Sequence, residues 1–270
     1  MTSWDELWIK AKKPFCVLLF LATLAATVLA QSPIYGCVLL FILLAQKIVQ
    51  YQVSKKYQTP FTWPYFIPMP NFFGTMGAVL PMEQSAPNRR ALFDIGIAGA
   101  ITGAILAVPA ILYGVFNSTF AVIPTEGTHM FLNKPLILQW ISRVILGSAP
   151  AGQDIVLHPV ALAGWAALFI NCINMIPLGH LDGGHVMHAL LGKNAKFLSY
   201  LVIVCFTYLG IQFHPIWIFF LVVTVLVSFK HPDPLETTQP IGLKRLLVAI
   251  GLYLLLALCF TPIPFELKLI

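Results

Sequence analysis

Two short segments carry the polar side chains that could do chemistry in this sequence. In LLAQKIVQY, residues 43–51, the side chains of Gln46, Lys47 and Gln50 interrupt an apolar run. In INCINMIPLGHLDGGHVMHALLG, residues 170–192, proline and glycine break a helical pattern that also carries Asp182. Broken helices with polar groups at membrane depth are where ion, substrate and metal sites are built. The second segment therefore predicts a site, whose candidate members are Asn174, His180, Asp182, His185 and His188. The alternative is a helix end at the membrane surface with ordinary polar caps.

The composition predicts an all-α polytopic membrane protein with one domain, 1–270. Hydrophobic residues make up 59% of the chain and charged residues 10%, whereas soluble domains carry about 25% charged residues. The mean hydropathy is +0.85. Apolar windows long enough to cross a bilayer indicate six to seven transmembrane helices. They are placed near 14–30, 34–53, 92–116, 159–178, 196–211, 214–230 and 243–260.

The charges predict a cytoplasmic N-terminus. With this orientation, twelve lysines and arginines fall on the cytoplasmic side and three on the other, which is a positive-inside bias. The cytoplasmic set is Lys10, Lys12, Lys13, Lys55, Lys56, Arg89, Arg90, Lys193, Lys196, Lys230, Lys244 and Arg245. Topology thus accounts for the net charge of +6, and we expect a lipid bilayer and no nucleic acid as partner. Alternatively, the first hydrophobic segment is a cleaved signal peptide.

Two segments do not read as transmembrane helices. Residues 58–83 are rich in proline and aromatic residues, which forbids a regular helix. We predict a membrane-associated irregular or β insertion there, with a short strand or hairpin within Phe72–Met82, serving as a docking site or as a plug. Residues 117–158 are predicted to form an extracytoplasmic loop, in which Leu136–Ile145 could be an interfacial amphipathic helix.

Several motifs resemble those of the site-2 proteases, the intramembrane zinc metalloproteases. Asn174-x-x-Pro177-x-x-x-Leu181-Asp182-Gly183 is similar to the family motif N-x-x-P-x-x-x-L-D-G. The blocks 63–68, 87–99, 158–165 and 259–265 look like the branch without a PDZ domain, found in bacterial or cyanobacterial inner membranes and plastid membranes. The resemblance implies a site-2-protease fold, with Asn174, Pro177 and Gly183 in supporting positions.

The resemblance also implies a zinc site, from which this sequence departs. In the family, H-E-x-x-H supplies two zinc ligands and the general base, and the aspartate of L-D-G, here Asp182, is the third ligand. The corresponding positions hold Gln46, Lys47 and Gln50. An amide is a poor zinc ligand and an ammonium cannot accept a proton. We therefore expect no catalytic residues and no bound zinc, and predict a pseudoprotease that binds a transmembrane client or a regulatory membrane protein.

Lys47 then requires an explanation, since a buried charge is costly. Without zinc, Asp182 would be an uncompensated carboxylate. We expect Lys47 and Asp182 to form an ion pair within about 4 Å, surrounded by Gln46, Gln50 and Asn174. The alternative is that Lys47 snorkels to the cytoplasmic surface.

Two other functions remain open. In the first, His180, His185 and His188 join Asp182 in a relocated zinc site, and the protein is an active intramembrane protease. In the second, Lys47 and Asp182 lie on the path of an ion or proton transporter.

Overall fold

A computed structural model describes most of the chain. Its described residues are 3–59, 63–80, 85–122, 128–179, 181–213, 215, 217–222, 239–262 and 265–269; for residues 3–13, 128–132 and 265–269 only the backbone is described. The helices are α1 (Ser3–Ala30), α2 (Pro33–Lys56), α3 (Arg89–Phe116), α4 (Leu136–Leu146), α5 (Pro159–Asn174), α6 (Asp182–Leu191), α7 (Ala195–Gln212) and α9 (Leu243–Cys259). A short 3-10 helix, Gly192–Asn194, joins α6 to α7, and residues 217–222 are helical.

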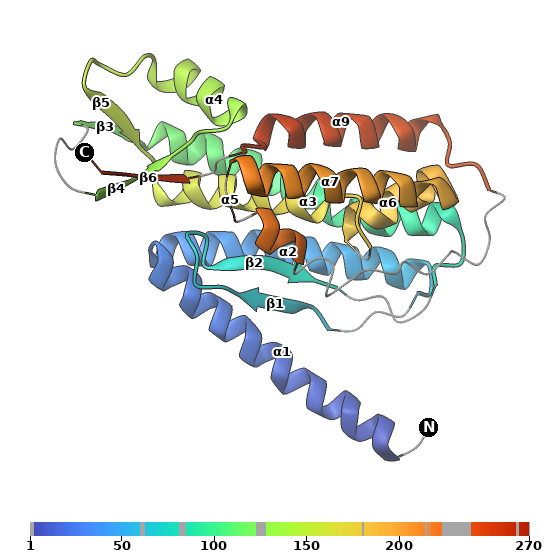
Figure 1. Cartoon of the computed structure of the whole chain (residues 1–270). Helices are drawn as coiled ribbons and strands as arrows, with labels where there is room; N and C mark the ends of the chain where they lie inside the picture. Colours follow the sequence, from blue (N-terminus) through green and yellow to red (C-terminus); the bar gives the residue numbers. More distant parts are fainter. Residues whose placement is uncertain are drawn as a thin grey trace.

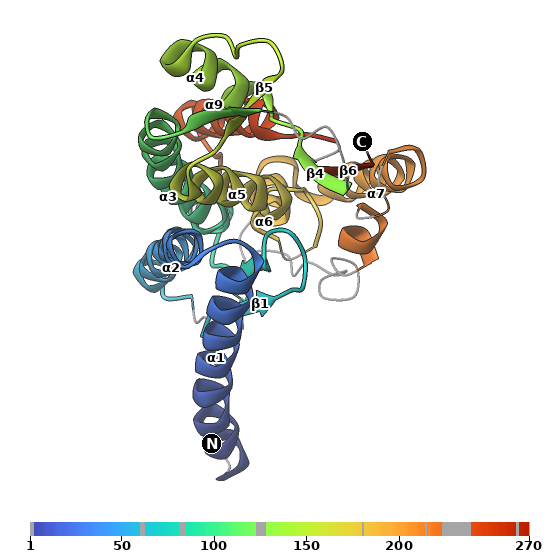
Figure 2. The ribbon, with the colours of Figure 1, turned by 90° about the vertical axis from the view of Figure 1, so that its left-hand side faces the viewer.

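Helix α3 is the centre of the bundle. It contacts α2, α5 and α6. In Figure 1 the axes of α2, α3, α7 and α9 run in roughly the same direction, while α1 runs obliquely away from them. Figure 2 looks along the bundle and shows α2, α3 and α5 nearly end-on. One end of the molecule, at the right of Figure 1, holds the end of α2, the start of α3, the end of α6 and the start of α9. The cations predicted to be cytoplasmic on these elements therefore share one end of the molecule.

The helix starts follow local capping rules. The Ser32 hydroxyl accepts a hydrogen bond from the Tyr35 backbone N–H, with Pro33 at the first helical position of α2. The Asn88 side chain accepts from the Ala91 N–H at the start of α3. We expected α1 to start at Pro14. The helix begins earlier, at Ser3, and continues through that proline.

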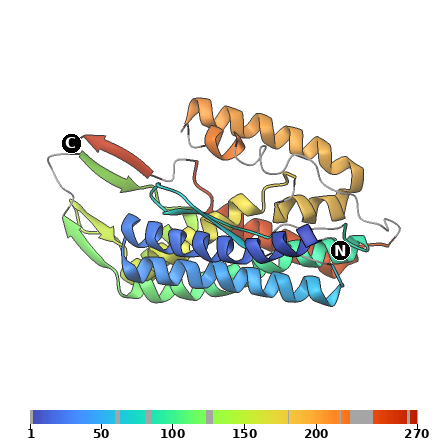
Figure 3. The same ribbon diagram turned by 90° about the horizontal axis from the view of Figure 1, so that it is seen from below.

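The proline-rich insertion forms a β-hairpin that is anchored in the core. Strands β1 (Tyr65–Pro68) and β2 (Thr75–Val79) pair antiparallel, with a bulge between Ile67 and Pro68. Only β2 lies inside the predicted range Phe72–Met82. The hairpin packs along α1, as Figure 3 shows from below. The Phe73 ring stacks on Phe169 of α5 with the ring centroids 5.1 Å apart.

The segment 117–158 contains α4 where the amphipathic helix was expected, together with strands that the sequence analysis missed. Strand β3 (Thr119–Val122) pairs with β5 (Gln153–Val156), and β4 (Thr128–Leu132) pairs with β6 (Phe265–Leu269), both antiparallel. These strands have only four or five residues and their partners are distant in sequence, so no local alternation identifies them.

The described helices match most of the predicted spans. Three are long and apolar enough to cross a membrane by length and composition: Pro33–Lys56, Arg89–Phe116 and the continuous stretch Asp182–Gln212. Shorter apolar helices cover Pro14–Ala30 and Pro159–Asn174. The span predicted at 159–178 ends earlier, at Asn174, and residues 223–230 of the predicted span 214–230 lie outside the described residues. The number of crossings stays a prediction.

The close approach of α3 and α5 at Gly114 gives a test of this packing. A Cβ atom there would lie 2.1 Å from the Ala161 backbone nitrogen. We expect Gly114→Ala to lower the free energy of unfolding by about 1–3 kcal/mol through overpacking, measured by SDS titration in mixed micelles. The matched control is Gly251→Ala in α9, where a Cβ meets no atom within 4 Å. Equal effects of the two substitutions would contradict this packing.

Candidate functional site

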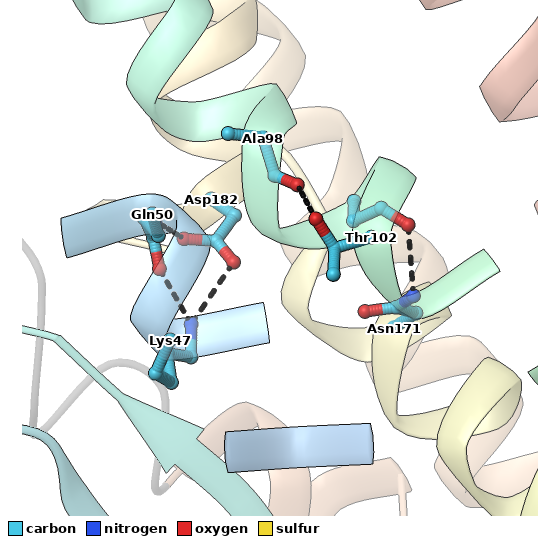
Figure 4. A network of polar contacts seen from close by, with 7 residues as sticks. Lys47, Gln50, Ala98, Thr102, Asn171 and Asp182 are labelled. Atoms are coloured by element: carbon cyan, nitrogen blue, oxygen red, sulfur yellow. Dashed lines mark hydrogen bonds and ion pairs between the residues drawn. The ribbon is translucent and has the colours of Figure 1, made fainter. Parts of the chain in front are cut away.

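The two polar segments meet at a buried ion pair between α2 and α6. Lys47 Nζ lies 3.3 Å from Asp182 Oδ2. Gln50 donates from Nε2 to Asp182 Oδ1 at 2.6 Å and accepts from Lys47 Nζ at 2.9 Å through Oε1. Figure 4 shows that these three side chains form a closed network. Lys47 is only 3% exposed, which does not fit a lysine that snorkels to the surface.

A sharp chain reversal places Asp182 in this position. Helix α5 ends at Asn174, and α6 begins at Asp182 itself, where the helix dipole favours a negative charge. Gly183 makes the reversal possible, because a Cβ atom there would lie 1.9 Å from the Met175 carbonyl oxygen. The Ser199 hydroxyl donates to the Pro177 carbonyl at 2.7 Å and so ties the turn to α7.

Two residues expected around the pair do not join it as hydrogen-bond donors. Gln46 Nε2 and Asn174 Nδ2 are buried and have no hydrogen-bond partner among the described residues. Both side chains are almost fully buried. Of the three expected amides, Gln50 alone donates to Asp182. That part of the sequence-based expectation is therefore wrong, because Gln46 faces a different part of α3.

Small residues on α3 form one wall of the site. A Cβ atom at Gly99 would lie 3.5 Å from Gln50 Oε1 and 3.6 Å from Asp182 Oδ2. At Gly103 it would lie 2.2 Å from Gln46 Nε2 and would overlap that amide. Asn171, on α5, donates from Nδ2 to the Ala100 carbonyl at 3.1 Å, beside the same wall. The glycines thus allow three helices to bring polar side chains together.

The histidines do not form a described cluster. His180 lies outside the described residues. His185 is 2% exposed and packs against α3, where a Cβ at Gly96 would lie 3.0 Å from its Cβ. His188 is half-buried on the last turn of α6. Among the residues that the structure describes, no group of three or more His, Cys, Asp or Glu side chains could hold a metal ion.

The described residues around Asp182 do not fit zinc. Zinc in proteins takes imidazole nitrogen, thiolate sulfur or carboxylate oxygen as ligands. The partners of the Asp182 carboxylate are an ammonium group, which has no lone pair, and an amide NH₂ group. Both donate to the oxygens that a metal would need.

A second polar network joins the end of α2 and the starts of α3 and α9 at the charged end of the bundle. Arg245, near the start of α9, donates from Nε to Asp94 Oδ1 at 2.7 Å and from Nη2 to Asp94 Oδ2 at 2.8 Å. The Tyr57 hydroxyl, just after α2, donates to Asp94 Oδ2 at 2.5 Å. Burial and this hydrogen bond raise the pKa of Tyr57. Sequence analysis missed the network, since Asp94 and Arg245 are 151 residues apart.

Comparison with known proteins identifies relatives for most of this region. The model of peptidase family M50 matches residues 27–213. "Probable zinc metalloprotease EGY1, chloroplastic" of Arabidopsis thaliana is 34% identical over 165 residues, which cover 60% of this chain and 30% of that protein. "Probable zinc metalloprotease EGY2, chloroplastic" of Oryza sativa subsp. japonica is 29% identical over 214 residues, covering 75% and 37%. The match therefore spans about a third of these relatives.

A solved structure also resembles the fold. The site-2 protease from Methanocaldococcus jannaschii is 16% identical, with a TM-score of 0.46 over 84% of this chain and 93% of that chain.

The buried pair predicts a characteristic pattern of stabilities. Lys47→Met leaves the Asp182 carboxylate buried without its cation, and we expect a loss of about 3–5 kcal/mol in the free energy of unfolding. Adding Asp182→Asn should recover much of the lost free energy of unfolding, because the second substitution removes the unpaired charge. Chemical unfolding of the four members of this double-mutant cycle in mixed micelles measures the coupling.

The control for this cycle is Lys134→Met, which breaks the more exposed pair with Asp154. We expect it to cost under about 1 kcal/mol. If Lys47→Met costs no more than Lys134→Met, the pair does not act as a buried ion pair.

Proposed function

The chain belongs to peptidase family M50, the site-2 proteases, and on that premise we propose that it is a catalytically degenerate member that binds transmembrane clients without cleaving them. The observation that carries this proposal is the buried contact between Lys47 Nζ and Asp182 Oδ2 at 3.3 Å. In the family, that aspartate is a zinc ligand. Here its charge is balanced by the chain itself.

The chemistry of hydrolysis needs groups that these positions lack. Zinc-assisted hydrolysis requires a bound water and a base that takes its proton. Lys47, at the position of the base, donates to both Gln50 and Asp182, and an ammonium that donates in this way cannot act as a base. Gln46 and Gln50, at the positions of the two histidines, present amides.

Client binding rests on different interactions, which the substitutions leave intact. Transmembrane helices associate through close packing, interhelical hydrogen bonds and small-residue contacts. None of these requires zinc. A transmembrane client or a regulatory membrane protein is therefore the partner that we propose, and shielding that client from an active protease is one consequence of binding it.

The membrane and the orientation belong to the same proposal. Relatives with chloroplastic names support a plastid membrane or the related cyanobacterial membrane. The cations gathered at one end of the bundle support a cytoplasmic or stromal N-terminus under the positive-inside rule. An active protease with relocated ligands would have to draw on His180, His185 or His188. No observation on the described residues favours a transporter.

Metal content separates the degenerate protein from an active protease. We expect the purified chain to hold well under one zinc per chain by elemental analysis. The triple substitution Gln46→His, Lys47→Glu and Gln50→His restores the family ligands and should bring zinc to about one per chain. Adding Asp182→Asn to this triple variant should remove that zinc again.

The opposite result is equally specific. About one zinc per chain in the unaltered protein, lost in Asp182→Asn or His188→Ala, would overturn the proposal and indicate a relocated metal site.

Binding without cleavage can be tested directly. We expect the full chain, reconstituted with a membrane-anchored substrate of an H-E-x-x-H family member, to co-purify with that substrate and to leave it intact. The intact family member is the positive control and should yield a cleaved product that a zinc chelator abolishes. A chelator-sensitive product from this chain would contradict the proposal, and so would the absence of any co-purified substrate.

A further inference from the structure

An apolar groove lies between α6 and α9, away from the polar site. Its volume is about 370 Å³. Met187 and Leu190 line it from α6, and Leu246, Ala249, Ile250, Tyr253 and Leu254 line it from one face of α9. The hydroxyl of Tyr253, in its wall, donates to the Met175 carbonyl at 3.1 Å. The Tyr253 hydroxyl therefore already has a hydrogen-bond partner. The contacts that the groove offers to a ligand are apolar.

Cations lie close in sequence to both walls of this groove, at one end of the bundle. Arg89 holds the end of α6, donating from Nε to the Ala189 carbonyl and from Nη2 to the carbonyl of Leu190, which lines the groove, at 2.7 and 2.8 Å. Lys193 follows Leu190 by three residues, and Lys244 precedes Leu246 by two. Both lysines are exposed. This is the end of the bundle where α6 finishes and α9 begins (Figure 1).

The described carboxylates do not neutralise these cations. Where the structure describes side chains, the carboxylates are Asp94, Asp154 and Asp182, and each lies in an ion pair. Their partners are Arg245, Lys134 and Lys47 respectively. Arg89 donates to backbone carbonyls, which carry no formal charge. Among the described side chains, the apolar groove therefore ends near cations that no carboxylate pairs with.

We propose that this groove binds an anionic glycerophospholipid, with one acyl chain along the wall between Leu246 and Leu254 and the phosphate near Lys193, Lys244 and Arg89. Basic pockets between transmembrane helices are suited to anionic headgroups, because the lysine and arginine side chains reach the interface while the apolar part enters the bundle. The inference goes beyond the proposed function and stands independently of it.

The dimensions favour an acyl chain over a helix. From Leu246 to Leu254 the helix advances by eight rises of 1.5 Å, about 12 Å. A helix of 10–12 Å diameter and that length occupies on the order of 1,000 Å³. The groove, at about 370 Å³, is smaller than that. A transmembrane helix of a client is the alternative occupant, and the experiment has to distinguish it from a lipid.

The experiment measures lipid binding to the delipidated full chain by native mass spectrometry in detergent, with added palmitoyl-oleoyl phosphatidylglycerol or phosphatidylcholine. We expect phosphatidylglycerol to bind with a defined stoichiometry and phosphatidylcholine to bind at least tenfold more weakly. The double substitution Lys193→Gln, Lys244→Gln should weaken phosphatidylglycerol binding on the order of 25-fold, about fivefold for each lysine.

A matched pair on α9 tests the groove itself. Ile250→Trp fills the groove, whereas Val248→Trp adds the same side chain at a position on the same helix that is not among the groove-lining residues. Both residues are 47% exposed, so the two variants should fold equally well. We expect phosphatidylglycerol binding to be lost in Ile250→Trp and kept in Val248→Trp.

Three results would overturn the proposal. Equal binding of both lipids would show that the charge does not select the headgroup. Equal effects of Ile250→Trp and Val248→Trp would show that the acyl chain of the lipid lies outside this groove. Loss of a co-purified client in Ile250→Trp with unchanged lipid binding would assign the groove to a helix. Because lipid binding is measured without any client, failure of the proposed function leaves this result unaffected.

Discussion

The structure is organised around one electrostatic requirement: a carboxylate inside an apolar bundle needs a compensating charge or proton. Asp182 meets that requirement with Lys47, and Gln50 accepts from one partner and donates to the other. The pair joins α2 to α6, and both helices pack against α3. The reversal between α5 and α6 and the glycines of α3 are what make the short contact possible.

Helix packing and polar chemistry are inseparable here. The glycines at 96, 99 and 103 on α3 would ordinarily be explained by close helix association. In this molecule they also leave room for polar side chains from α2, α5 and α6, so that adding one methyl group at Gly103 would collide with the Gln46 amide. A small-residue stripe can therefore serve as the wall of a site without contributing a single functional atom.

The sequence allowed much of this arrangement to be predicted, and the failures have physical causes. The contact between Lys47 and Asp182 was expected because the family resemblance places both residues at one zinc site, and a buried charge there requires a partner. The directions of Gln46 and Asn174 were not predictable, since the rotation of each amide depends on its neighbours, which include Gly103 of α3 for Gln46 and Gly77 of β2 for Asn174. The short strands β3 to β6 and the Asp94–Arg245 pair depend on segments far apart in the sequence. His180 lies outside the described residues, so its predicted role stays a prediction.

The Asp94–Arg245 contact has a consequence for biogenesis. A membrane protein is synthesised and inserted from its N-terminus, and Arg245 emerges from the ribosome 151 residues after Asp94. Until α9 is made, the start of α3 carries a carboxylate without its bidentate partner. The nascent bundle therefore passes through a stage in which its first helices are already inserted but Asp94 still lacks its ion pair with Arg245.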